Sequence, residues 1–355
     1  LMKNKIDIIK PDDWHVHLRE GNILNIVSKF SSRINNRCIV MPNLNPPITS
    51  THMAKKYIGE ILESINFKSF LPLIPCYLTD ELDLNDFKQG LINNIFIGAK
   101  LYPLNATTNS KYGVSDIEKI FPALAILEDL NKNLLIHGEK VSGKIDLSER
   151  EKYFIDDELI TIKKYFPNLN IVLEHVSTKY GADFISENNN IAGTITPHHM
   201  LITSKDVYKN NTINPHLFCM PVAKEEKDLI ALRKYACSGN AKFFLGTDSA
   251  PHVVEDKDPS KTIKPGIFSA PCSIELYAEI FEEENSLENL EKFSSINGPK
   301  FYSLPINKDK ITLFRQSWKL KEFTISDENR IKNFYGDKEL KWKVVLQDQL
   351  KENIR

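Results

Sequence analysis

The amino-acid sequence predicts a (β/α)8 TIM barrel with a C-terminal extension. Three observations support this fold: short apolar runs recur along the chain, amphipathic stretches lie between them, and polar residues close several of the runs. Strands buried on both faces of a parallel sheet are continuous apolar runs, whereas outer helices carry apolar residues three and four positions apart. Alternation of these two patterns is typical of strands and helices that close into a barrel.

The predicted strands are short apolar segments bounded by turn residues or charges. There are eight, and in order they cover residues 6–17, 37–43, 70–79, 95–103, 134–139, 171–177, 191–199 and 241–249. The amphipathic stretches between them, which we expect to form outer helices, include residues 50–64, 115–130, 156–165, 224–238 and 273–283. We assign residues 1–305 to one barrel domain, because such barrels often exceed about 250 residues. Residues 306–355 are expected to pack on it as an extension.

Charge and composition limit the classes of partner. Lys and Arg number 46 and Asp and Glu number 47, so the net charge of −1 argues against the basic face that nucleic acid requires. No apolar run approaches the roughly 20 residues of a membrane span, and the first residues lack an apolar secretion segment. We expect a cytoplasmic protein with a small-molecule partner. The five cysteines, an odd number without a CxxC pair, are expected to be buried, reduced thiols.

His15 and His17 close the first predicted strand. Side chains alternate along a strand, so both imidazoles point to the same face and can converge on one ion. Alone, this pair is a weak signal. It fits a metal site about as well as it fits two ordinary polar residues of a barrel.

Three more residues close later strands: His137 follows the fifth, His175 the sixth and Asp248 the eighth. Taken singly, each is better explained as a hydrogen-bonded histidine or a helix-capping aspartate. Together with His15 and His17, they place four imidazoles and a carboxylate at one rim of the barrel. That cluster is costly without a cation, and its nitrogen and oxygen donors suit zinc.

Lys100 places a single ammonium inside the apolar segment IFIGAKLYP. One interpretation is a lysine at the strand end whose charge reaches solvent. The other is an amine that loses its proton because it lies beside metal cations and out of water. A free amine can take up carbon dioxide as a carbamate, whose two oxygens are enough to bridge two metals.

Several motifs carry a resemblance to a known family. They are residues 11–21 (PDDWHVHLREG), 40–47 (VMPNLNPP), 99–110 (AKLYPLNATTNS), 137–139 (HGE), 174–179 (EHVSTK), 196–199 (TPHH), 246–252 (GTDSAPH) and 297–305 (NGPKFYSLP). This set resembles the single-function bacterial dihydroorotases of the amidohydrolase superfamily, from about Lys10 to Pro305. The resemblance implies a barrel of the metal-dependent hydrolase type. It also implies a reaction, the reversible cyclisation of N-carbamoyl-L-aspartate to L-dihydroorotate with loss of water, which is the third step of de novo pyrimidine biosynthesis.

The resemblance further implies two zinc ions per chain, bridged by a carboxylated lysine and a hydroxide. The implied metal ligands are His15, His17 and Asp248 on one ion, His137 and His175 on the other, and Lys100 between them. Two metals at a shared hydroxide lower its pKa and polarise the amide under attack. Asp248 is the implied catalytic residue, which would take the hydroxide's proton and pass it to the leaving nitrogen.

Arg19, Asn43 and His252 match family residues that hold the carboxylate of dihydroorotate. A guanidinium group suits a planar carboxylate, so the chemistry agrees with the resemblance. Read alone, each residue has a plainer explanation: a surface salt bridge for Arg19, a turn for Asn43 and a helix cap for His252.

Four more substrate contacts are implied by the resemblance. Thr107 and Thr108 lie in residues 105–110 (NATTNS), a small polar loop that fits a mobile lid as well as a plain surface loop. Met220 matches a backbone contact with the pyrimidine ring. Pro265 matches a second backbone contact, although proline has no N–H to donate.

His198 and His199 follow the seventh predicted strand. With the metal positions filled, we expect at least one of His198 and His199 to hydrogen-bond to the metal ligands rather than to bind metal.

A hydantoinase or dihydropyrimidinase would share the metals but not the carboxylate-binding residues, and Arg19 with Asn43 argues against it. A catalytically dead barrel serving as a scaffold would tolerate loss of ligands, and this chain retains them. The resemblance also implies a homodimer.

Overall fold

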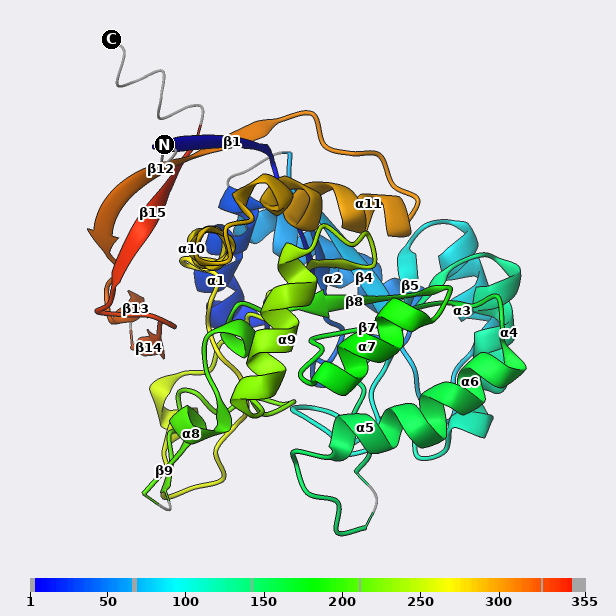
Figure 1. Cartoon of the computed structure of the whole chain (residues 1–355). Coiled ribbons are helices and arrows are strands. Elements are labelled where there is room, and N and C mark those ends of the chain that lie inside the picture. The colour runs from blue at the N-terminus through cyan, green and yellow to red at the C-terminus, as the bar shows by residue number, and fades with distance from the viewer. Residues whose placement is uncertain (1–3, 66–68, 142, 211, 327, 347–355) are drawn as a thin grey trace.

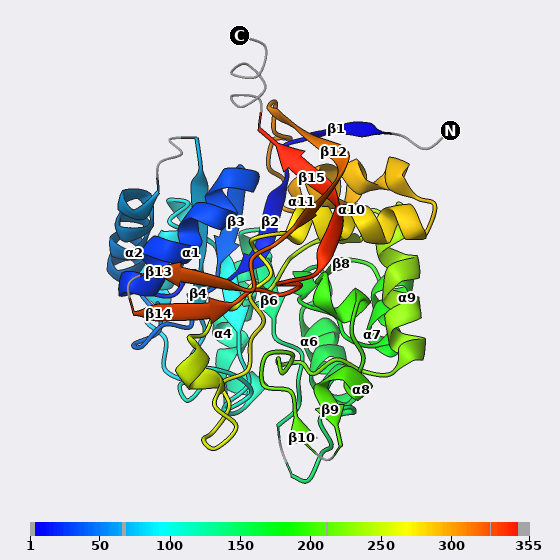
Figure 2. The same cartoon turned by 90° about the vertical axis from the view of Figure 1, so that its left-hand side faces the viewer.

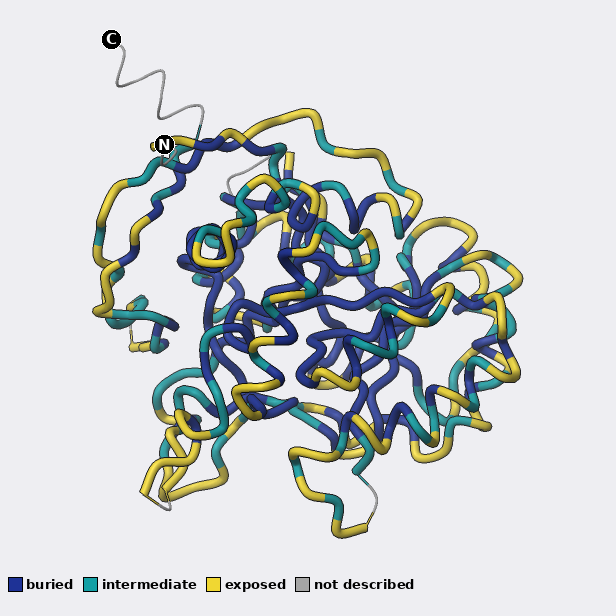
Figure 3. Tube along the Cα trace, viewed as in Figure 1, coloured by how far each residue is buried: buried dark blue, intermediate teal, exposed yellow. Residues whose placement is uncertain are grey.

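The computed structural model describes residues 4–65, 69–141, 143–210, 212–326 and 328–346. Its centre is a sheet of eight parallel strands in the order β11-β8-β7-β6-β5-β4-β3-β2. These strands are β2 (Asp12–Val16), β3 (Arg37–Val40), β4 (Leu71–Tyr77), β5 (Phe96–Leu101), β6 (Asn133–Ile136), β7 (Asn170–Leu173), β8 (Ile191–Ile195) and β11 (Phe243–Leu245). They are almost entirely buried, as Figure 3 shows, which explains their continuous apolar sequence.

The barrel closes between its first and last strands, β2 and β11. Val16 forms a parallel bridge with Ser249, just beyond β11, and His17 N donates to Ser249 O at 3.0 Å. Asp248 N donates to His15 O at 2.8 Å. The closure therefore brings His15 and His17 beside Asp248, although more than 230 positions separate them in the sequence.

Helices surround the strands (Figure 1). The helices of the described residues are α1 (Gly21–Ile34), α2 (Thr51–Ser64), α3 (Leu84–Ile92), α4 (Phe121–Asp129), α5 (Arg150–Phe154), α6 (Ile160–Tyr165), α7 (Lys179–Glu187), α8 (Ser204–Val207), α9 (Glu226–Cys237), α10 (Ser273–Glu283) and α11 (Asn297–Phe301). The amphipathic stretches predicted helices at α2, α4, α6, α9 and α10, and all five are present. The cap of α2 follows its sequence, because the Ser50 side chain accepts a hydrogen bond from Met53 N at 3.3 Å.

The prediction of one strand over residues 6–17 is wrong, because this segment forms two strands in different sheets. β1 (Lys5–Ile9) alternates buried Ile6 and Ile8 with exposed Lys5 and Asp7, a pattern of a half-buried strand. It pairs antiparallel with β12 (Lys310–Lys319), and only β2, after Pro11, enters the barrel.

The segment after the barrel forms strands that pack over its outer face (Figure 2). β12 pairs with β15 (Glu339–Val345) to complete an antiparallel sheet in the order β1-β12-β15. β13 (Phe323–Ser326) and β14 (Asn329–Lys332) pair with each other, as do the two-residue strands β9 (Tyr208–Lys209) and β10 (Thr212–Ile213). Residues 347–355 of the predicted extension lie outside the described residues.

The amino end of the barrel is plugged by apolar side chains. Trp14 stacks on Tyr302 from the segment after α11, with ring centroids 4.4 Å apart, and meets Phe244 edge-on at 6.2 Å. A Cβ at Gly298 would lie 1.9 Å from Trp14 Nε1, so only glycine fits there. With this end filled, the carboxyl ends of the strands are left for polar groups.

All five cysteines are buried and unpaired, as predicted. Among the described residues, no helix combines the length and the apolar character needed to cross a bilayer.

Candidate metal centre

The predicted ligands meet at the carboxyl ends of the strands. His15 lies in β2, Lys100 in β5, and the other four directly follow β2, β6, β7 or β11 within three residues. A small cavity of about 20 Å³ lies among them, lined by His15, His17, Arg19, Asn43, Tyr102, Thr107, Thr108, His137, His175, Met220, Asp248, Ala250, Pro265 and Gly266. Of the residues predicted for the site, Lys100 and His252 alone are not on this lining. A larger surface cavity of about 690 Å³, beside α5, α7 and α9, contains none of them.

His15, His17 and Asp248 converge on a single point. The Nε2 atoms of the two histidines are 3.3 Å apart, and each lies 3.1 Å from Asp248 Oδ1. Burial would raise the pKa of Asp248, but the charge of His15 and the hydrogen bond from its Nε2 hold that pKa well below the usual value, so the carboxylate is ionised. Two imidazole nitrogens and an anionic oxygen so close together favour a shared cation.

The orientation of His17 leaves Nε2 free to bind a metal. Its other nitrogen, Nδ1, lies 3.0 Å from Asn43 Oδ1, which can only accept, so Nδ1 carries the proton. Burial lowers the pKa of His17 to about 4, and the imidazole is neutral at physiological pH. A neutral imidazole whose Nε2 lone pair faces Asp248 is a suitable zinc ligand.

Glu174 connects Lys100 to His15. The Lys100 ammonium pairs with Glu174 Oε2, and His15 Nδ1 lies 3.0 Å from Glu174 Oε1. Burial lowers the pKa of His15, but Glu174 and Asp248 outweigh it and raise that pKa to about 9. The same carboxylates would favour any positive charge at this point, whether a proton or a metal ion. Burial lowers the pKa of Lys100 although Glu174 opposes it, which suits an amine that must be neutral to react.

His137 and His175 form the second converging pair. His137 Nε2 lies 2.7 Å from Glu139 Oε2, so it donates there and Nδ1 is the ring nitrogen that remains for another partner. That Nδ1 lies 3.1 Å from His175 Nε2. Burial lowers the pKa of His175 well below its usual value, so this imidazole is neutral too. His15, His175 and Asp248 also place donor atoms within 4.8 Å of one another, close enough to hold a metal ion.

The backbone at two of these residues is unusual. His175 and Asp248 have φ angles of 41° and 46°, which non-glycine residues seldom adopt. Asp13 stabilises the backbone conformation of Asp248 through its neighbour Thr247. The Asp13 carboxylate accepts hydrogen bonds from Thr247 N at 2.9 Å and from Thr247 Oγ1 at 2.6 Å. Such strain persists only where neighbours hold it, and it is typical of functional sites.

Arg19 and His252 lie together at one side of the cavity. Arg19 Nη2 donates to His252 Nε2 at 3.0 Å, and Arg19 Nε donates to Pro251 O at 3.1 Å. His252 Nε2 accepts from the guanidinium and therefore carries no proton. It also lies 3.0 Å from Pro265 O, but without a proton it cannot donate a hydrogen bond to that oxygen. Burial lowers the pKa of His252 to about 3, so Arg19 supplies the positive charge of this pair.

The loop that contains Thr107 and Thr108 is closed over the cavity. Asn43 Nδ2 donates to Thr108 O at 2.9 Å, and Asn109 Nδ2 donates to Asn43 O at 2.9 Å. Tyr77 OH donates to Asn109 O at 3.2 Å. The enclosed space holds about one water molecule, so a larger ligand needs part of the cavity wall, to which Thr107 and Thr108 belong, to move.

Sequence reasoning missed three buried carboxylates that hold the predicted residues in place: Asp13, Glu139 and Glu174. The available signal was their spacing, since Asp13 and Glu139 lie two residues from His15 and His137, and Glu174 precedes His175. The expectation for His198 and His199 was wrong. Among the described residues neither hydrogen-bonds to the six ligands: His199 contacts Thr196 and Pro221, and His198 has no partner.

Comparison with known proteins gives a consistent result. The model of the amidohydrolase family matches residues 8–313. The dihydroorotase of Buchnera aphidicola subsp. Schizaphis graminum is 43% identical over 343 residues, covering 96% of this chain and 98% of its own. The crystal structure of dihydroorotase in complex with 5-fluoroorotic acid from Saccharomyces cerevisiae superposes with a TM-score of 0.89 at 32% identity, covering 97% of this chain and 99% of that one. An L-hydantoinase from Arthrobacter aurescens, 17% identical with a TM-score of 0.78 over 96% of this chain and 85% of its own, shares the fold alone.

Proposed function

The chain belongs to the amidohydrolase family, and within it we propose that it is a dihydroorotase. It interconverts N-carbamoyl-L-aspartate and L-dihydroorotate, the third step of de novo pyrimidine biosynthesis. In ring closure the carbamoyl nitrogen bonds to the side-chain carboxyl carbon and water leaves. The single observation that carries the proposal is the convergence of His15, His17, His137, His175 and Asp248, with Arg19, on one cavity at the carboxyl end of the barrel.

Two zinc ions per chain are the proposed cofactors. His15, His17 and Asp248 would hold one ion, His137 and His175 the other, and a carboxylated Lys100 would bridge them. The donor set supports this assignment: the neutral imidazole of His17 directs Nε2 toward the ionised carboxylate of Asp248, and His137 holds Glu139 through Nε2 and so keeps Nδ1 for a metal. Bound there, the cations would polarise the amide carbonyl and lower the pKa of the attacking water.

Glu174 is compatible with both states of Lys100. It pairs with the ammonium and also faces His15 Nδ1. A carbamate nitrogen keeps one N–H, which can still donate to Glu174 Oε2. We propose that Glu174 orients Lys100 and His15, and that Glu139 does the same for His137.

Asp248 is the proposed proton carrier. Its ionised carboxylate lies on the cavity wall, and the backbone around it is fixed by Asp13 through Thr247. In ring opening it accepts a proton from the attacking water and returns it to the leaving ring nitrogen. Its fixed orientation means that the transfer needs no rearrangement of the backbone.

Arg19 is the proposed partner of the substrate carboxylate. His252 and Pro251 O already hold two of its guanidinium nitrogens, so the group is oriented before substrate arrives. Asn43 would join the contact, but in the closed state its amide is occupied by His17 and Thr108. We therefore propose that opening of the 105–110 loop frees Asn43 as well as the cavity. Thr107, Thr108, Met220 and Pro265 all line the cavity, which is compatible with the substrate contacts proposed for them.

Two other functions fit the site less well. A hydantoinase-type substrate has no carboxylate for Arg19, and the L-hydantoinase similarity is limited to the fold. A scaffold without catalysis would have no need for a strained, buried set of charged donors. We also propose that residues 1–305 form the catalytic domain and that the protein is a cytoplasmic homodimer.

The test is an assay of the zinc-loaded protein in both directions. We expect it to open L-dihydroorotate and to close N-carbamoyl-L-aspartate, with little turnover of hydantoin or dihydrouracil. D248N should lose about 100-fold or more in kcat while its melting temperature stays close to that of the parent. Preference for the uncharged rings would overturn the proposed substrate, and near-normal turnover by D248N would overturn the role of Asp248.

A further inference from the structure

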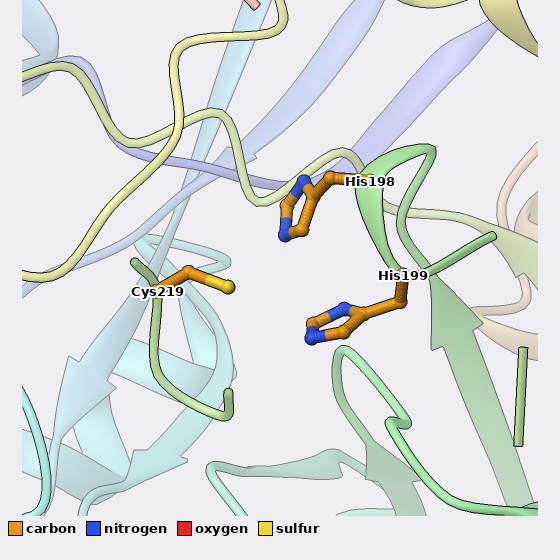
Figure 4. Close-up of side chains that lie close together, drawn as sticks. All are labelled: His198, His199 and Cys219. Atoms are coloured by element: carbon orange, nitrogen blue, oxygen red, sulfur yellow. The ribbon is translucent and has the colours of Figure 1, made fainter. Parts of the chain in front are cut away.

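Three metal-binding side chains lie together outside the proposed zinc centre. They are His198 and His199, in the short turn after β8, and Cys219, in the segment before α9 (Figure 4). Their donor atoms lie within 4.8 Å of one another, and each side chain is at most 2% exposed. None of the three belongs to the six ligands proposed for the zinc centre.

His198 is the unexplained member of this group. Neither of its ring nitrogens has a hydrogen-bond partner among the described residues, although its exposure is 0%. An unpaired buried polar group costs about 1–3 kcal/mol. In Figure 4 the ring is directed toward Cys219 and His199, so a ligand between the three residues would remove this cost.

A fourth donor lies within the group. Pro221 O is 2.9 Å from His199 Nε2 and 3.2 Å from Cys219 Sγ. His199 Nδ1 faces Thr196 Oγ1 at 2.8 Å, which would orient the ring while Nε2 binds an ion. Pro221 O therefore adjoins two of the three side-chain donors and could complete a set of two nitrogens, one sulfur and one oxygen.

We propose that His198, His199, Cys219 and Pro221 O form a separate, buried site for Zn²⁺. Zinc accepts nitrogen, sulfur and oxygen in a tetrahedron whose corners lie about 3.3–3.7 Å apart, so side-chain movements of about 1 Å close the group around it. The cation would also explain the thiol. Burial raises the pKa of Cys219 to about 12, whereas coordination removes its proton outright.

The site would tie the end of β8 to the segment that carries Met220. Cys219 adjoins Met220, which lines the central cavity. Ligands 20 residues apart in sequence, His199 and Cys219, would be held by one ion. Such a clip stabilises the folded chain because the unfolded chain has no preformed site.

Cobalt is a specific probe, because the proposed dinuclear centre has no sulfur ligand. We expect metal-free protein titrated with Co²⁺ to develop a thiolate-to-cobalt charge-transfer band. C219S should lose the band and bind one metal ion fewer per chain. C76S is the matched control, since Cys76 is equally buried but lies in β4, and it should keep the band. H198Q should bind this cobalt at least tenfold more weakly, and thermal melting would verify that each variant is folded.

Three results would overturn the site. They are no thiolate band in the parent protein, a band that persists in C219S, and an unchanged cobalt affinity in H198Q. Competition by Zn²⁺ should bleach the band in the parent protein, and failure to compete would exclude zinc as the occupant. The readout does not depend on turnover, so it stands or falls separately from the proposed activity.

Discussion

Replacing Glu174 with glutamine tests how the buried charges of the centre support one another. Glu174 has 1% exposure and faces both the Lys100 ammonium and His15 Nδ1. Glutamine keeps the shape and can still accept from His15, but it brings an amide N–H₂ toward Lys100. The lysine, at 0% exposure, is then left without an anionic partner.

The size of the effect follows from the cost of an unpaired buried charge. Removing one partner of a buried ion pair lowers the free energy of unfolding by about 3–5 kcal/mol. Lys100 can avoid the unpaired charge by releasing its proton. Releasing it at pH 7 from an amine with a pKa of about 10.4 costs about 4.6 kcal/mol, which sets an upper limit on the loss. We therefore expect E174Q to lower the free energy of unfolding of the metal-free protein by about 3–5 kcal/mol. Its zinc affinity should fall about 10- to 100-fold, because Glu174 orients a ligand.

The assay is urea unfolding of the metal-free protein together with competitive zinc titration. D12N is the control, because Asp12 is also buried and ion-paired, with Arg37, but lies at the first residue of β2, at the amino end of the strand. It should lose stability without losing zinc affinity. If E174Q unfolds within about 1 kcal/mol of the parent and binds zinc equally well, the charge network does not support the centre as we describe it.

Other predictions address single residues. K100A should bind fewer zinc ions, and metal analysis that still gives two per chain with full turnover would exclude a bridging lysine. R19M should raise KM for L-dihydroorotate about 10- to 100-fold, because a charge-assisted pair is lost, but should change KM for an uncharged dihydropyrimidine little; equal effects would contradict the carboxylate contact. Burial lowers the pKa of His252 to about 3 from its ordinary value of about 6.5, so its contribution to stability is present above pH 6.5 and is lost as the pH falls from 6.5 toward 3. The free energy of unfolding should therefore fall less between pH 8 and pH 5 in H252Q than in the parent, by at most about 2 kcal/mol, and identical pH profiles from urea unfolding would refute this.

The residues that close strands could be predicted because their position depends on local sequence. His15 and His17 lie two residues apart at the end of β2, and Lys100, His137, His175 and Asp248 each end an apolar run. Parallel strands therefore carry all six to one edge. The dihydroorotase resemblance supplied their implied roles. The boundary between β1 and β2 was not predictable in the same way, because the partner of β1 is β12, about 300 residues later.

The sequence by itself determined the alternation of strands and helices and the residues at the strand ends, since both depend on periodicity and on neighbours along the chain. Only the tertiary structure decided which groups hold those residues. Asp13 reaches Thr247, Glu174 joins Lys100 to His15, and His198 lies among buried donors with no hydrogen-bond partner in the described part of the chain. These relations depend on the closure of the barrel and on burial that lowers the local dielectric, and neither is encoded in any short stretch of sequence.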